Sequence, residues 1–256
     1  MATFGEIMRT IGRAAATAGA FIGRKAAEGY RFVDPDLRRH IFQTPLLAHT
    51  LFISTEEELE PQEPDGHPPL VFVHGLGGNR GNFFLMSKYL AFYGRKRSYK
   101  IHFKYGLSIE EMAAELTGFV EKVKEITGSD KVDIVAHSLG GLVARLAICE
   151  LGLDRSVSRF ITLGTPHKGS FPARLAASQR IMDLRPESEL IKRLERVGLP
   201  EGVRCFSLWS KSDLLVLPPE SAILEGSEAI EAKNFTHYSY LLDPSCWASV
   251  AALLKA

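Results

Sequence analysis

The chain has 256 residues, of which 45% are hydrophobic and 24% charged, a balance typical of a folded globular protein and unlike a disordered or membrane-spanning chain. Its 31 Lys and Arg residues nearly match its 30 Asp and Glu residues, and the resulting net charge of +1 gives no sign of a nucleic-acid partner. The three cysteines are scattered, which argues against a disulfide framework and favours a reducing, cytoplasmic compartment.

The first residues carry a basic amphipathic pattern. Apolar residues between Phe4 and Ile22 recur at three- and four-residue spacing with arginines interspersed, which predicts a helix over residues 3–30 within an N-terminal extension of residues 1–50. Its longest uncharged stretch, Ala14 to Gly23, is too short to span a bilayer. Three roles stay open for this helix: peripheral contact with a membrane, dimerisation, or docking on the rest of the fold.

The rest of the chain, residues 51–256, is predicted to form one α/β domain. An acidic, proline-rich stretch at residues 56–69 predicts an exposed loop before it. Apolar runs then alternate with helical patterns, which predicts a mostly parallel central sheet with helices on both faces. The predicted strands are Leu70–Val73, Tyr99–Phe103, Lys131–Val135, Ser158–Leu163 and Val203–Trp209, and the helices between the first three of them are Asn82–Tyr93 and Ile109–Ile126.

A glycine-rich loop, His74-Gly-Leu-Gly-Gly78, follows the first strand of this domain. A loop of this kind can cradle phosphate, but the sequence has neither a dinucleotide-binding Gly-x-Gly-x-x-Gly nor a Gly-Lys-Ser/Thr motif here. The backbone amide of Leu76 is instead free to serve another ligand.

Ser138 lies between a predicted strand and a predicted helix, in the segment Ala136-His-Ser-Leu-Gly-Gly141. A serine on a sharp strand-to-helix turn, with small residues two positions before and after it, is typical of a nucleophile elbow. Ala136 stands where that pattern has glycine, a difference of one methyl group. The alternative is a serine that only caps the following helix.

About forty residues without a strand pattern follow the fourth strand. Because ligands bind at the carboxyl ends of the strands in α/β folds, this insertion, at about residues 170–202, predicts a helical lid. Extra helical packing without a gating role is the alternative. The segment Gly164-Thr-Pro-His-Lys-Gly-Ser170 leads into it.

An activated serine needs a histidine base and a carboxylate that orients this base. Asp213 directly follows the last predicted strand, and His237 lies on a loop before a C-terminal helix that starts near Pro244. Asp133, Asp183, Asp243 and Glu225 are alternatives to Asp213, less well placed in the pattern. Backbone amides of Leu76 and Leu139 are the predicted donors to an oxyanion.

From Leu70 to Leu254 the sequence resembles the α/β-hydrolase superfamily, in particular its lipases and esterases. The His-Gly loop, the Ala-His-Ser-Leu-Gly-Gly elbow and the Gly-Thr-Pro-His-x-Gly-Ser segment carry the resemblance. It implies Ser138 as nucleophile, Asp213 as acid, His237 as base, Leu76 and Leu139 as oxyanion donors, and no redox or organic cofactor. Some related bacterial lipases hold a structural calcium ion, but we match no ligand set for it and expect no metal.

The expected reaction is hydrolysis of a carboxylic ester or lipid through an acyl-enzyme. An acyltransferase or a phospholipase with the same site is an alternative. A non-catalytic binding module is another, although such a protein is expected to have lost one of these elements. Candidates for an apolar wall of the pocket are Phe83, Phe84, Leu107, Leu175, Leu214 and Leu215, and core packing is an equally good interpretation for each of them.

Overall fold

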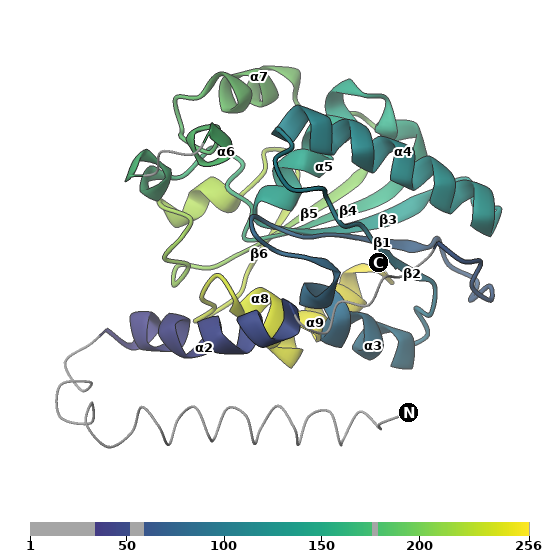
Figure 1. Ribbon diagram of the computed structural model, residues 1–256, viewed down its shortest axis with the longest axis horizontal. Helices are drawn as coiled ribbons and strands as arrows, with labels where there is room; N and C mark the ends of the chain where they lie inside the picture. The colour runs from purple at the N-terminus through teal and green to yellow at the C-terminus, as the bar shows by residue number, and fades with distance from the viewer. Residues whose placement is uncertain (1–33, 52–58, 176–178, 256) are drawn as a thin grey trace.

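The computed structural model describes residues 34–51, 59–175 and 179–255, which form a sheet with helices on both faces (Figure 1). The sheet has six strands in the order β2-β1-β3-β4-β5-β6, and all five pairings are parallel. The strands are β1 (Leu70–Val73), β2 (Ser98–Lys100), β3 (Val132–His137), β4 (Val157–Leu163), β5 (Arg204–Trp209) and β6 (Glu228–Glu231). The predicted parallel α/β sheet is confirmed.

Two apolar cores lie on the two faces of this sheet. Helices α4 (Ile109–Thr127) and α5 (Leu139–Glu150) cover one face, and α3 (Phe84–Phe92), α8 (Ser239–Leu242) and α9 (Pro244–Leu253) cover the other (Figure 1). Alternate residues of a strand point to opposite faces, so Val71 and Val73 join the first core while Leu70 and Phe72 join the second. Strands buried on both faces need the continuous apolar runs seen in the sequence.

The boundaries of the predicted elements shift by a few residues, and one element was not predicted. The expected strand Tyr99–Phe103 is the shorter β2, and the expected helix Asn82–Tyr93 is a 3₁₀ turn, η2 (Arg80–Phe83), followed by α3. β6 lacks an apolar run: three of its four residues are exposed. It pairs with β5 at the edge of the sheet, where few of its side chains need burial.

The insertion after β4 divides into two parts. A 3₁₀ turn, η4 (Phe171–Leu175), and a short helix, α6 (Gln179–Met182), lie in its first part, and α7 (Glu189–Val197) follows. Leu190, Ile191 and Leu194 of α7 are buried in the core that α5 shares. The second half of the insertion therefore adds helical packing to this core.

Helix α2 (Pro35–Leu51) lies on the same face of the sheet as α8 and α9 (Figure 1). The helix predicted over residues 3–30 is outside the described residues. In the part of the chain that the structure describes, no helix combines the length and the apolar character that crossing a bilayer requires.

Candidate active site

Ser138 occupies a sharp turn between β3 and α5. Its φ of 54° and ψ of −127° place a non-glycine residue in a strained backbone region. The Ser138 amide donates a hydrogen bond to the Leu163 carbonyl on the neighbouring strand, at 3.0 Å. The turn is thus fixed between the strand end and the helix, in the geometry that the elbow pattern predicts.

Glycines surround the turn because other backbone approaches it closely. A Cβ on Gly140 would lie 2.5 Å from the His74 carbonyl oxygen and 2.6 Å from that of Val73. A Cβ on Gly75 would lie 2.9 Å from the Cβ of Ser138. The end of β1 therefore packs directly on the turn, which brings the glycine-rich loop next to Ser138.

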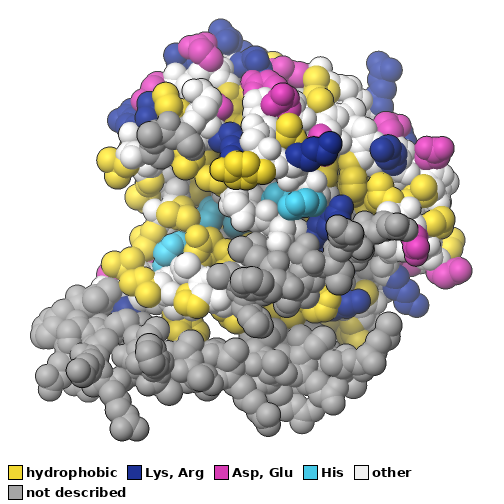
Figure 2. Space-filling model, viewed as in Figure 1, with side chains coloured by type: hydrophobic (Ala, Val, Ile, Leu, Met, Phe, Trp, Pro, Cys, Tyr) yellow, Lys and Arg dark blue, Asp and Glu magenta, His cyan; other side chains and the backbone are white. Residues whose placement is uncertain are grey.

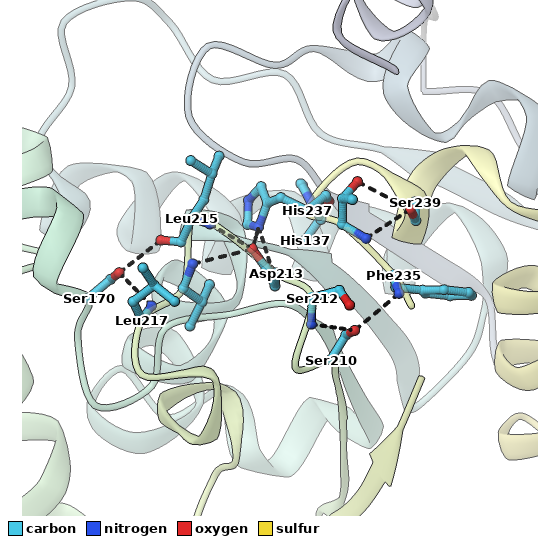
Figure 3. Close-up of polar contacts among 12 residues, drawn as sticks. His137, Ser170, Ser210, Ser212, Asp213, Leu215, Leu217, Phe235, His237 and Ser239 are labelled. Atoms are coloured by element: carbon cyan, nitrogen blue, oxygen red, sulfur yellow. Dashed lines mark hydrogen bonds and ion pairs between the residues drawn. The ribbon is translucent and has the colours of Figure 1, made fainter. Parts of the chain in front are cut away.

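Asp213 and His237, 24 residues apart in the chain, meet beyond the end of β5 (Figure 3). The Nδ1 atom of His237 lies 2.9 Å from Oδ2 and 3.1 Å from Oδ1 of Asp213, and both side chains are buried. The Oδ1 atom of Asp213 also accepts hydrogen bonds from the amides of Leu215, at 2.9 Å, and Val216, at 3.2 Å. The carboxylate is therefore held by its own loop and bonds to the imidazole.

Gly164 makes room for this carboxylate. Its φ is +55°, and a Cβ at this position would lie 2.9 Å from Asp213 Oδ2 and 2.5 Å from the ring of Tyr240. Any side chain at this position, the first glycine of the Gly-Thr-Pro-His-x-Gly-Ser segment, would therefore displace the candidate acid.

The alternative acids have other partners or positions. Asp133 pairs with Arg95 and Arg159 inside the sheet, and Asp243 caps α9 through the Ser245 amide. Asp183 accepts from the side chain of Gln179, and Glu225 lines a separate cavity. Within the described residues, Asp213 is the carboxylate that bonds to His237.

A cavity of about 510 Å³ opens at Ser138 and His237. In the view of Figure 2, histidine side chains lie among hydrophobic ones on the face between α6 and α2. Most of the surface of the cavity is apolar. Its walls come from the glycine-rich loop, the insertion, the loop after β5, the loop at His237, and α2; they include Leu76, Ala173, Ile181, Leu184, Leu215, Val216, Leu241 and, from α2, Thr44 and Leu47.

Of the six residues predicted for the apolar wall, Leu215 lines this cavity. Phe83 is buried in the core beneath the sheet, and Phe84 and Leu107 pack against the two cores. Leu175 is 94% exposed. Leu214 is half-buried and is not among the described residues that line this cavity. Core packing, the alternative interpretation, therefore describes Phe83, Phe84 and Leu107, because the sequence does not show which face of a loop or helix turns to the cavity.

The predicted oxyanion donors belong to two segments that meet near Ser138. Leu76 is in the loop that lines the cavity, and Leu139 is the first residue of α5, directly after Ser138. The Gly78 amide donates to the Gly75 carbonyl at 3.1 Å, which closes this loop into a turn. The first amides of a helix have no carbonyl partner within the helix, so the Leu139 amide is available to a ligand.

His137, which the sequence did not single out, supports the candidate base. Its Nε2 lies 3.0 Å from the carbonyl oxygen of His237, and the two rings are 4.7 Å apart. Burial lowers the pKa of His137 well below its usual range, with the charge of His237 as a lesser cause. A neutral His137 that donates from Nε2 therefore fixes the backbone of His237.

His167 has a structural role in the segment after β4. It is fully buried, its Nε2 lies 3.2 Å from Thr162 Oγ1, and its carbonyl accepts from Arg145 at 3.1 Å.

Ser170, at the end of this segment, donates from Oγ to the Leu215 carbonyl at 2.8 Å and accepts from the Leu217 amide at 3.0 Å (Figure 3). The segment thus ties the start of the insertion to the loop that carries Asp213.

Nowhere in residues 34–51, 59–175 and 179–255 do three or more His, Cys, Asp or Glu side chains gather to hold a metal ion.

Comparison with known proteins finds sequence relatives among the triacylglycerol lipases. Triacylglycerol lipase 2 of Saccharomyces cerevisiae is 40% identical over 68 residues, which cover 25% of this chain and 21% of that protein. A triacylglycerol lipase of Pseudarthrobacter phenanthrenivorans is 29% identical over 113 residues, 40% of this chain and 34% of that protein. The chain thus spans about a third or less of the length of these curated relatives.

Solved structures show the same fold at low sequence identity. The mature form of Bacillus licheniformis lipase BlEst2 superposes with a TM-score of 0.65 at 22% identity, over 77% of this chain and 96% of that one. Aspergillus fumigatus lipase B gives a TM-score of 0.68 at 18% identity, over 78% of this chain and 55% of that one.

The sequence model of the class 2 lipases matches residues 67–241, more than half of the chain. This region holds the elbow, the glycine-rich loop, Asp213 and His237. The chain, an α/β-hydrolase by fold, therefore belongs to the class 2 lipase family.

Proposed function

We propose that this protein hydrolyses carboxylic esters, with Ser138 as nucleophile, His237 as general base and Asp213 as the carboxylate that orients this base. One observation carries the proposal: Ser138 and His237 line the same apolar cavity, and Asp213 bonds to Nδ1 of His237. Membership of the lipase family supports the same chemistry.

In the proposed reaction, His237 takes the proton of the Ser138 hydroxyl through Nε2, and the Ser138 oxygen attacks the ester carbonyl carbon. The amides of Leu76 and Leu139 stabilise the negative oxygen that forms, and each lowers the activation barrier by about 3 kcal/mol. The ester C–O bond then breaks, and the proton on His237 passes to the departing alcohol. Water repeats the attack on the acyl-enzyme, and the carboxylic acid leaves.

Asp213 has two roles in this scheme. It fixes the tautomer in which Nδ1 of His237 carries a proton and Nε2 is free to accept one, and its charge stabilises the imidazolium that forms in the transition state. Two backbone amides hold the carboxylate in place, so it is pre-organised for both.

The cavity favours a substrate with an apolar acyl chain. Leu184, Val216 and Leu241 are among the side chains of its wall, and an acyl chain displaces water from such a surface at a gain of about 0.8 kcal/mol per buried methylene. We therefore propose an ester or lipid substrate, in keeping with the triacylglycerol lipases among the relatives.

A p-nitrophenyl ester series from acetate to palmitate tests the proposal. Ser138→Ala should abolish turnover while the protein stays folded, and Asp213→Asn should lower kcat by about four orders of magnitude, because it favours the wrong tautomer of His237. Asp243→Asn is the matched control: this residue caps α9 and should leave kcat near the wild-type value. Equal turnover in Ser138→Ala and wild type would rule out the proposed nucleophile.

A further inference from the structure

Helix α2 contacts the loop that carries His237, although the family match begins at residue 67. Arg39 donates to the carbonyl of Asn234, and the ring of His40 stacks on Tyr238 at 4.7 Å. Burial lowers the pKa of His40, and the charge of His237 is the next cause, as expected for neighbouring groups. The loop is thus packed against a helix outside the matched region.

The most direct of these contacts comes from Gln43. Its Nε2 donates to Ser239 Oγ at 3.0 Å, and its Oε1 accepts from Ser239 Oγ at 3.2 Å and from Thr236 Oγ1. Thr236 and Ser239 stand one residue before and two residues after His237, and both are buried. One side chain from α2 therefore bridges the two sides of the candidate base.

The two hydroxyls are themselves part of the turn at His237. Ser239 Oγ accepts from the Thr236 amide at 3.0 Å, and the Ser239 amide donates to the Thr236 carbonyl at 2.9 Å. Figure 3 shows Ser239 beside His237, with Ser210 holding the Phe235 amide at 3.1 Å from the other side. Gln43 thus bonds to both hydroxyls of this turn.

We propose that Gln43 is a positioning residue for His237, so that α2 completes the catalytic machinery from outside the matched family region. Gln43 acts through Thr236 and Ser239 and does not touch the reacting atoms. The inference rests on the proposed function, since it concerns the geometry of the general base. A base displaced by even a fraction of an ångström loses its alignment with the serine hydroxyl, which costs rate more than binding.

Gln43→Met tests this role, with Gln62→Met as matched control. Gln62 is also half-buried and also makes two hydrogen bonds, to the carbonyl and amide of Ser98, and neither residue lines the cavity. Both variants should lower the melting temperature by a similar amount. Gln43→Met alone should lower kcat on a short-chain ester by about tenfold with little change in KM.

Gln43→Glu separates positioning from general stability. It keeps an oxygen that accepts from Thr236 and Ser239, so it should recover much of the lost kcat. The added negative charge favours protonated His237, and the acidic limb of the pH profile should therefore move to higher pH. Thr236→Val removes the other end of the bridge, and combined with Gln43→Met it should slow the enzyme no further than the worse single variant.

A readout independent of ester hydrolysis keeps the proposal separate from the proposed function. The proton between His237 Nδ1 and Asp213 should resonate far downfield in proton NMR, and its exchange with water measures how firmly the loop is held. Exchange should be faster in Gln43→Met than in wild type and Gln62→Met, whether or not the protein hydrolyses the esters offered. If Gln43→Met fails to fold, Thr236→Val is measured in its place. Exchange and kcat equal to those of Gln62→Met would overturn the proposal.

Discussion

Two glycines on neighbouring helices differ in whether the surrounding structure requires a glycine. Gly140 lies in the first turn of α5, where the carbonyls of Val73 and His74 leave no space for a Cβ. Gly118 lies in the middle of α4, and a Cβ there would meet nothing within 4 Å. The sequence pattern around Ser138 predicts the first glycine from its steric requirement, whereas only the structure shows that the second has none.

Gly140→Ala and Gly118→Ala should therefore change stability in opposite directions. Gly140→Ala forces β1 away from the elbow and should lower the free energy of unfolding by about 1–3 kcal/mol, with a loss of ester hydrolysis. Gly118→Ala removes backbone freedom from the unfolded chain and should raise it by about 0.5–1 kcal/mol. Urea denaturation and activity assays of both variants check this, and a stable, active Gly140→Ala would contradict the close approach of β1.

At the scale of elements, the cavity is assembled from segments that are distant in the sequence. The first half of the insertion contributes Ala173, Ile181 and Leu184, and α2 contributes Thr44 and Leu47. The predicted lid therefore forms part of a wall, and its opening and closing stays a prediction. Shortening the insertion should lower activity on long-chain esters more than on acetate.

Leu47→Phe tests the wall that α2 provides. The larger side chain fills part of the cavity, so kcat/KM on the palmitate ester should fall about tenfold relative to that on the butyrate ester. Leu46→Phe is the control, since Leu46 adjoins Leu47 on α2 but is absent from the cavity wall in the described part of the chain. An identical chain-length profile for the two variants would show that the acyl chain does not reach α2.

At the scale of the whole molecule, buried histidines link stability to pH. Burial lowers the pKa of His74 to about 4 and the pKa values of His137 and His167 well below the usual range. These side chains stay neutral in the folded protein, whereas in the unfolded chain they titrate near pH 6.5. Below that pH the unfolded chain binds protons that the folded protein does not, so stability is present above pH 6.5 and is lost as the pH falls.

The free energy of unfolding should therefore fall between pH 6.5 and 5.5, by up to about 1.4 kcal/mol for each buried histidine. Carboxyl groups with lowered pKa, such as Asp65 and Glu121, add their own loss only at lower pH. Urea denaturation at pH 7.5, 6.5 and 5.5 measures how the free energy of unfolding changes with pH, and His167→Gln should make that change smaller. A stability that is flat across this range would contradict the neutral, buried histidines.

Features that depend on residues close together in the chain could be predicted from the sequence alone. The apolar runs of β1, β3, β4 and β5 predict buried parallel strands, because strands covered on both faces bury every side chain. The elbow at Ser138 was predictable for the same kind of reason: a sharp turn needs small neighbours. Asp213 and His237 were candidates from their positions after a strand and on a late loop, and their roles stay predictions that the bond between them supports.

Contacts between distant segments were decided by the tertiary structure. β6 was not predicted from the sequence, because an edge strand needs no apolar run. His137 bonds to a carbonyl 100 residues later, and Gln43 to a hydroxyl 193 residues later. Neither contact leaves a pattern in the sequence, because a hydrogen bond specifies the distance between two atoms in space and not the spacing of residues along the chain. For the same reason the sequence left the candidates for the cavity wall open between pocket and core: the apolar residues of core and cavity are alike in sequence, and packing alone determines which of them face the cavity.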